Sequence, residues 1–196
     1  MTLTVTGPVR SRTFRVLWLL EELGLDYEHR VEMPHSEAVS ALNPLRQVPV
    51  LQVDESVLTD SLAILHYLAD REGRLTYRVG TPERARMEAR INFVLTEIEA
   101  PLWMRTRHGY VLPEGMRHPE IFPMLEAELR MAEKKFANIL GDDEFLAGDE
   151  FTIADIVAGH CAGWAIGLEM VDESGPLGAY FNRLKARPAW VRGRKE

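Results

Sequence analysis

The sequence predicts a two-domain protein, in which an α/β domain of βαβ-α-ββα order is followed by an all-α helical bundle. In residues 1–72, apolar side chains alternate with polar ones in some segments and recur at helical spacing in others. After residue 82, they recur at helical spacing only. The segment GRLTYRVGT at 73–81 has the composition of a linker. We therefore expect domains at residues 1–73 and 82–196.

The elements of the first domain follow from their periodicity and from the residues that break it. Leu3 and Val5 alternate with threonines until Gly7-Pro8 ends the strand, and Gly24 stands where a glycine ends the first helix. The predicted elements after the first strand are a helix at 14–23, a strand at 25–33, a short helix at 36–42, strands at 49–53 and 57–59, and a helix at 61–72. The first two strands should be parallel and joined by a right-handed crossover.

The second domain shows two clear helix starts. Thr81-Pro82-Glu83 combines a cap, a proline at the first helical position and an acid in the first turn. Thr152 and Asp155 have the spacing of a capping box. The predicted helices run from 82 to a kink at Pro101, from 119 to 140, from 152 onward, and from 178 to 186.

Composition excludes several classes of function. The net charge of −7 and the pI near 5.5 argue against nucleic acid as the main partner. The single cysteine, Cys161, rules out a disulfide framework or a cysteine-rich metal site and fits a reducing cytoplasm. We expect Cys161 to be a small apolar helix residue. The apolar run at 16–20 is too short to cross a membrane, and the N-terminus has no secretory signal pattern.

The pairs Val48-Pro49 and Asp60-Ser61 are the most informative local feature. A proline at a strand entry is compatible with a cis peptide in a tight turn, which leaves backbone groups of the preceding residue free for a ligand. A helix that begins at Asp60-Ser61 offers unpaired N–H groups to an anion. Asp60 could equally be a plain helix cap. Together the two pairs suit a small acidic peptide.

Other side chains have a structural and a functional interpretation. Ser11 is either a cap of the first helix or a hydroxyl donor to a thiolate bound at the helix N-terminus. His35, Arg46 and Gln47 are either solvated or placed to meet a second carboxylate. The tail 183–196, with six Lys or Arg against one Glu, is either a solvated chain end or a basic flap near an acidic ligand. The remaining candidates are the apolar and basic side chains after Pro101, namely Trp103, Met104 and Arg107, which are either core residues or the lining of a pocket.

Four motifs in order resemble those of the cytosolic glutathione S-transferases, of a bacterial-style theta- and delta-like serine type. They are SRTFRVLWLLEELGLDYE at 11–28, NPLRQVPVL at 43–51, DSLAILHYL at 60–68 and FLAGDEFTIADI at 145–156. The resemblance covers nearly the whole chain. It implies a thioredoxin-like fold for the first domain, glutathione as co-substrate, no metal, and a cytoplasmic, homodimeric detoxification transferase. In the homodimer, the 61–72 and 82–100 helices of the two subunits would meet.

The resemblance also implies roles for individual residues. Ser11 would donate to the glutathione sulfur, and Val48, before a cis Pro49, would pair through its backbone with the cysteinyl part. Asp60 and Ser61 would hold the γ-glutamyl amine and carboxylate. The remaining implied contacts are Gln47 and His35 with the glycyl carboxylate, and Trp103, Met104 and Arg107 with a small hydrophobic electrophile.

The sequence departs from the family pattern at several positions. Arg46 replaces a usual glycine, no tyrosine lies near Ser11, and Arg12 directly follows Ser11. The region after Pro188 is short, so we expect a reduced final helix and a more open cleft. Two alternatives remain at this stage: another glutathione-dependent chemistry (peroxidase, dehalogenase or isomerase), and a transferase-like binding module without catalysis.

Overall fold

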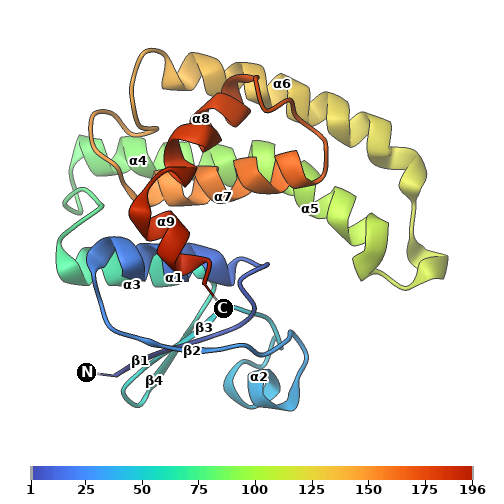
Figure 1. Cartoon of the computed structure of the whole chain (residues 1–196). Coiled ribbons are helices and arrows are strands. Elements are labelled where there is room, and N and C mark those ends of the chain that lie inside the picture. The colour runs from blue at the N-terminus through green and yellow to red at the C-terminus, as the bar shows by residue number, and fades with distance from the viewer. Residues whose placement is uncertain (1, 196) are drawn as a thin grey trace. The chain divides into compact units, whose positions relative to one another are not determined.

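A computed structural model describes residues 2–195 and divides them into two compact units. Residues 2–78 together with 185–195 form the first unit, and residues 79–184 form the helical unit (Figure 1). This division differs from the predicted domains in its last residues. The chain end groups with the first unit because helix α9 (Pro188–Gly193) packs against helix α1 (Thr13–Leu23).

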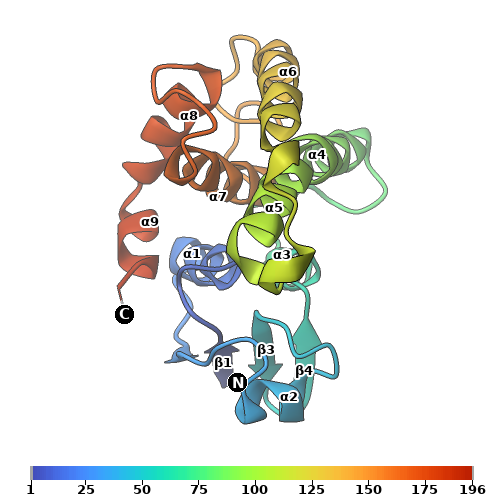
Figure 2. The same cartoon turned by 90° about the vertical axis from the view of Figure 1, so that its right-hand side faces the viewer.

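The first unit contains a four-stranded mixed sheet in the order β2-β1-β3-β4. Its strands are β1 (Leu3–Thr6), β2 (Glu28–Arg30), β3 (Val50–Val53) and β4 (Ser56–Thr59). Strand β1 pairs in parallel with β2 and antiparallel with β3, as the predicted βαβ-α-ββα order requires. Helices α1 and α3 (Ser61–Glu72) lie on one face of the sheet, and the short α2 (Glu37–Leu42) lies away from them (Figure 2).

Strand β2 is shorter than the predicted strand at 25–33. The alternation of apolar residues continues to Val31 and Met33, but these side chains are 55% and 63% exposed. Only Glu28–Arg30 pairs with β1, because β1 itself offers four residues to its neighbours. Alternation therefore overestimated a strand whose length is set by its partner.

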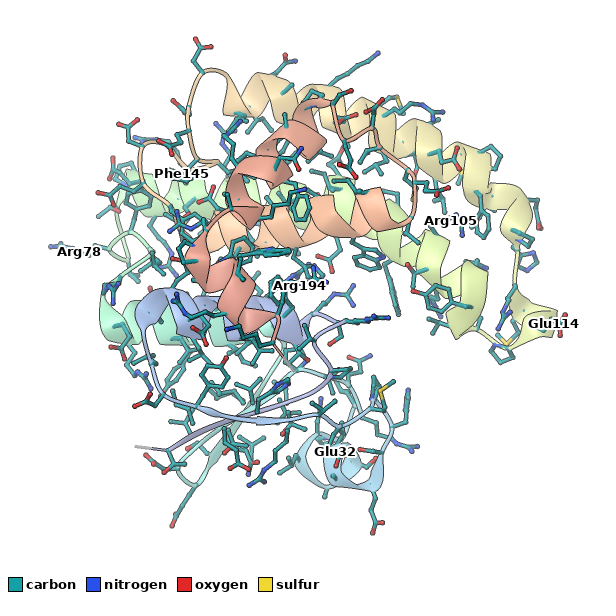
Figure 3. The ribbon with its side chains drawn as sticks, in the orientation of Figure 1. Glu32, Arg78, Arg105, Glu114, Phe145 and Arg194 are labelled. Atoms are coloured by element: carbon teal, nitrogen blue, oxygen red, sulfur yellow. The ribbon has the colours of Figure 1, made fainter. Side chains whose placement is uncertain are left out.

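The chain end is tied to α1 rather than solvated. Arg187 pairs with Glu22 at 2.6 Å, and Arg192 pairs with Glu21 at 2.6 Å. Beyond α9, the Arg194 guanidinium lies 4.8 Å from the centre of the Trp190 ring (Figure 3). These contacts use basic residues of the tail as anchors of α9, a short final helix of six residues. The family resemblance implied a reduced final helix, whereas periodicity gave no bounds for it.

The helical unit is built around α6 (Phe122–Leu140) and α7 (Ile153–Gly167), with α4 (Pro82–Phe93), α5 (Ala100–Thr106) and α8 (Pro176–Lys185). The predicted apolar stripe of α6 is buried, at Leu125, Leu129, Ala132, Phe136 and Leu140. The expected kink at Pro101 takes a specific form. Residues Val94–Glu99 form π-helical turns directly before it. A widened turn accommodates a proline that cannot donate a backbone hydrogen bond.

The start of α7 is held by a capping box around Asp155, as predicted. The Asp155 carboxylate is fully buried and accepts from the backbone N–H groups of Leu146 and Thr152, each at 2.7 Å. It also accepts from the hydroxyls of Thr152 and Tyr180. All polar capacity of this carboxylate is thus used inside the unit, which gives it a structural role.

Two tyrosines make the fold sensitive to alkaline pH. Burial, followed by the hydrogen bond to Glu21, raises the pKa of Tyr27 to about 12. Burial and the nearby Asp155 charge hold the pKa of Tyr180 well above its ordinary value. The unfolded chain releases these protons from about pH 10, before the native state does. The native state therefore binds more protons in this range, and stability must fall as pH rises.

We expect the free energy of unfolding to decline between about pH 10 and pH 12. Tyr27→Phe should make the slope of this decline shallower by less than one bound proton, because a single phenol carries one proton and its native and unfolded titrations overlap. Urea titrations at a series of pH values would measure how steeply the free energy of unfolding falls with pH in the wild type and in Tyr27→Phe. The two proteins would also be compared at neutral pH, as the reference. An unchanged slope in Tyr27→Phe would show that Tyr27 does not contribute.

Candidate functional site

Ser11 lies in the loop between β1 and α1, two residues before the helix begins. Its Oγ is half-buried and lies 2.7 Å from the Pro8 carbonyl oxygen and 2.9 Å from Thr13 Oγ1. It also accepts from the Thr13 backbone N–H at 3.1 Å. The hydroxyl therefore does satisfy a helix N–H, as the capping interpretation required. It does so while remaining partly accessible.

Gly7 brings the Ser11 loop close to Val48. Its φ of 139° is one that residues with side chains rarely adopt. A Cβ at Gly7 would lie 2.2 Å from Thr13 Oγ1 and 2.8 Å from Val48 Cβ. Only a glycine allows this close approach. As a result, the end of β1, the start of α1 and the entry to β3 lie next to one another.

Val48-Pro49 has the cis peptide that the sequence suggested. Pro49 is buried and Val48 is half-buried at the entry to β3. The loop before it is held by the buried Asn43, whose Nδ2 donates to the Gln47 carbonyl at 2.8 Å. Its Oδ1 accepts from the Leu45 N–H at 3.0 Å. One buried amide thus shapes the approach to the cis peptide.

Asp60 caps α3 with one carboxylate oxygen. Its Oδ1 accepts from the N–H groups of Leu62 and Ala63, at 2.9 and 3.0 Å. Its φ of 70° is in the left-handed region, an uncommon conformation for a residue with a side chain and one that clusters at ligand sites. Asp60 is exposed, so the capping interaction leaves carboxylate surface available to a cation.

Ser61 is buried and contacts a charged side chain that sequence reasoning assigned no role. The Arg15 Nη1 donates to Ser61 Oγ at 3.4 Å, and Arg15 is only 1% exposed. The sequence did carry one signal for this contact. Arg15 is the only charged residue in the run from Thr13 to Leu20, all of which is buried. A guanidinium beside the N-terminus of α3 adds positive charge where helix N–H groups already favour an anion.

The loop from 35 to 47 shows what Arg46 does in place of glycine. Its φ of 57° explains why a glycine suits this position. The Arg46 guanidinium turns back into the loop and donates to the His35 carbonyl and to Ser40 Oγ, both at 3.0 Å. Arg46 therefore braces the loop, while the His35 and Gln47 side chains remain exposed.

The two helix N-termini differ in their electrostatics. Helix α1 has no acidic residue in its first turn, so the positive end of its dipole is not offset there. At the start of α3, the Asp60 carboxylate caps the helix, and the Arg15 guanidinium adds a positive charge beside Ser61. Cis Val48-Pro49 belongs to the same unit. The arrangement can bind an extended, negatively charged peptide and can lower the pKa of a thiol held at a helix N-terminus.

The candidates for an electrophile pocket belong to the helical unit. Trp103 and Met104 are half-buried on α5, and Arg107 is exposed at its end. Trp164 donates from its indole N–H to Thr106 Oγ1 at 3.0 Å, which ties α7 to α5. Their role in binding an electrophile stays a prediction. Cys161 is fully buried, with its Sγ 3.6 Å from a Glu99 carboxylate oxygen, as expected of a packed helix residue.

Residues 2–195 show neither a cluster of metal ligands nor a membrane-spanning helix. Within that range, no group of three or more His, Cys, Asp or Glu side chains is arranged to hold a metal ion. None of the helices described there is both long and apolar enough to span a bilayer.

Comparisons with known proteins give a consistent result. Residues 11–71 match the family model "Glutathione S-transferase, N-terminal domain", and residues 110–188 match "Glutathione S-transferase, C-terminal domain". The chain is 28% identical to glutathione S-transferase GstA of Escherichia coli O157:H7, over 76% of this chain and 72% of that protein. It is 31% identical to bovine (Bos taurus) glutathione S-transferase theta-1, over 79% of this chain and 64% of that protein.

A solved structure extends the similarity to the fold. The theta class glutathione S-transferase of Xanthomonas axonopodis pv. citri, determined with glutathione bound, is 26% identical with a TM-score of 0.80. The match covers 100% of this chain and 98% of that one.

Proposed function

Because this chain belongs to the cytosolic glutathione S-transferase family, we propose that its first unit binds glutathione and activates the thiol for attack on a hydrophobic electrophile. The observation that carries the proposal is the meeting of Ser11, cis Val48-Pro49 and the two helix N-termini in one unit. In this proposal, Ser11 donates its hydroxyl proton to the sulfur.

Each part of glutathione has a complementary group. The Val48 backbone pairs with the cysteinyl residue, as one strand pairs with the next. Ser61 and the start of α3 hold the γ-glutamyl carboxylate, with Arg15 behind Ser61. The free side of the Asp60 carboxylate meets the α-ammonium group. Gln47 and His35 contact the glycyl carboxylate.

The chemical contribution of the protein is to stabilise the thiolate. A free thiol has a pKa near ~8.5 and is mostly protonated at neutral pH. The Ser11 hydroxyl and the N-terminus of α1 both favour the anion over the neutral thiol. The thiolate attacks an electrophilic carbon, forms the carbon–sulfur bond and expels the leaving group with its electron pair. Trp103, Met104 and Arg107 hold the electrophile in this proposal.

Other aspects of the family resemblance stay predictions. They are a homodimer through α3 and α4, a cytoplasmic location and a role in detoxification. A glutathione-dependent peroxidase, dehalogenase or isomerase would use the same thiolate, so it differs only in the second substrate.

Glutathione binding and conjugation together test the proposed function. We expect the purified chain to be retained on immobilised glutathione and to melt at a higher temperature in millimolar glutathione, as mass action requires. A tripeptide with alanine in place of cysteine should raise the melting temperature less. An aryl halide should be conjugated, with hydroperoxide reduction measured beside it. The absence of retention and of thermal stabilisation would contradict the proposal and favour a non-catalytic module.

A further inference from the structure

We propose that Thr13 is a positioning residue that makes Ser11 a one-way proton donor, an inference that rests on the proposed function. Thr13 is the first residue of α1, and its side chain has no exposed surface. Its hydroxyl lies 2.9 Å from Ser11 Oγ. Thr13 lies inside the motif at 11–28, but the family resemblance implies no role for it.

The Thr13 hydroxyl has one available acceptor. Among residues 2–195, Ser11 is the only hydrogen-bond partner of Thr13 Oγ1. The Gly7 backbone packs against the same oxygen so closely that a Cβ there would lie 2.2 Å from it. Buried hydroxyls satisfy their proton, and leaving one unpaired costs about 1 to 3 kcal/mol. The Ser11 hydroxyl carries one proton and lies within donor reach of both Thr13 Oγ1 and the Pro8 carbonyl oxygen. We assign that proton to the nearer acceptor, Pro8, so that the Thr13 O–H donates to Ser11 Oγ.

This assignment fixes the polarity of the Ser11 hydroxyl. Ser11 Oγ then accepts twice, from the Thr13 N–H at 3.1 Å and from the Thr13 O–H. A hydroxyl oxygen has two lone pairs, so its capacity to accept is filled. Its own proton points to the Pro8 carbonyl oxygen at 2.7 Å. Rotation of this O–H away from Pro8 would direct it toward a bound sulfur.

The polarity has a chemical consequence. Ser11 can donate a hydrogen bond to a thiolate, but it cannot receive the proton of a thiol, because both acceptor positions are occupied. The thiol proton therefore goes to an acceptor other than Ser11. Two incoming hydrogen bonds also polarise the Ser11 O–H and make it a stronger donor. Thr13 thus acts on the bound sulfur through Ser11 without touching it.

Thr13→Val keeps the shape of the side chain and removes its proton. We expect the acid dissociation constant of bound glutathione to fall about three- to tenfold, the equivalent of one neutral hydrogen bond. Thr13→Ser keeps the hydroxyl and should titrate like the wild type. Thr96→Val, which removes an exposed hydroxyl from the helical unit, is the matched control and should also titrate like the wild type.

The measurement is the ultraviolet absorbance of the thiolate, titrated with pH for the full-length protein saturated with glutathione. The same titration of Thr13→Ala provides a second hydroxyl-free variant if Thr13→Val does not fold. The role of Thr13 would be overturned if Thr13→Val or Thr13→Ala titrated like the wild type. It would also be overturned if Thr13→Ser showed the shift expected of the variants that lack the hydroxyl. A wild-type protein that binds glutathione but forms no thiolate near neutral pH would overturn the proposed function itself.

Discussion

Asp155→Asn should lower the free energy of unfolding by about 3 to 5 kcal/mol, the cost of breaking a buried, fully hydrogen-bonded charge. The Asp155 carboxylate receives four hydrogen bonds, from Leu146, from Thr152 twice and from Tyr180. An amide has the same shape but only one acceptor oxygen. Its NH₂ group would face at least one backbone N–H, donor against donor.

Equilibrium unfolding of the full-length chain in urea measures this loss. Asp172→Asn is a matched control, because Asp172 also accepts from a backbone N–H and a hydroxyl, both of Ser174, but at the surface. We expect its effect to be much smaller, since water replaces lost partners there. Equal effects of the two substitutions would mean that burial of Asp155 is not what makes it important.

Ser11→Ala should reduce kcat/KM for conjugation about 10- to 100-fold, because a hydrogen bond to a charged group contributes about 1.5 to 3 kcal/mol. The loss should come from the thiolate: the pKa of bound glutathione should rise toward that of the free thiol. Binding of glutathione should change little, since the Val48 backbone and the Asp60-Ser61 helix start are untouched. Ser174→Ala, in an exposed turn of the helical unit, serves as the control.

Steady-state kinetics with an aryl halide and thermal shifts with glutathione separate these effects. If Ser11→Ala conjugates the aryl halide at the wild-type rate, the assignment of Ser11 is wrong. In that case Arg12, which directly follows Ser11, becomes the next candidate for the sulfur. Loss of both binding and conjugation would instead indicate that Ser11 holds the loop before α1 in shape.

Much of the fold was predictable because its signals are local. The structure confirms three such predictions: the capping box of Thr152 and Asp155, Gly24 with φ 71° at the C-terminal end of α1, and the cis Val48-Pro49 peptide. Each depends on a few neighbouring residues, whose backbone preferences dominate at helix ends and turns. The parallel pairing of the first two strands followed from the βαβ order alone.

The features that local signals did not predict depend on residues that lie far apart in the sequence. Helix α9 is only six residues long and carries little intrinsic helical signal. It is stabilised by pairs that span the whole chain, such as Arg187 with Glu22 and Arg192 with Glu21. A reader of the sequence sees only a basic tail.

The sequence by itself determined which residues start helices, where the cis proline stands and which family the chain resembles. Only the tertiary structure decided what their side chains touch. It placed Arg15 against Ser61 across 46 positions of sequence, and it buried Thr13 with its hydroxyl 2.9 Å from Ser11 Oγ. The reason is physical: propensity acts between neighbours along the chain, whereas the direction of a buried hydrogen bond is set by every group that packs around it.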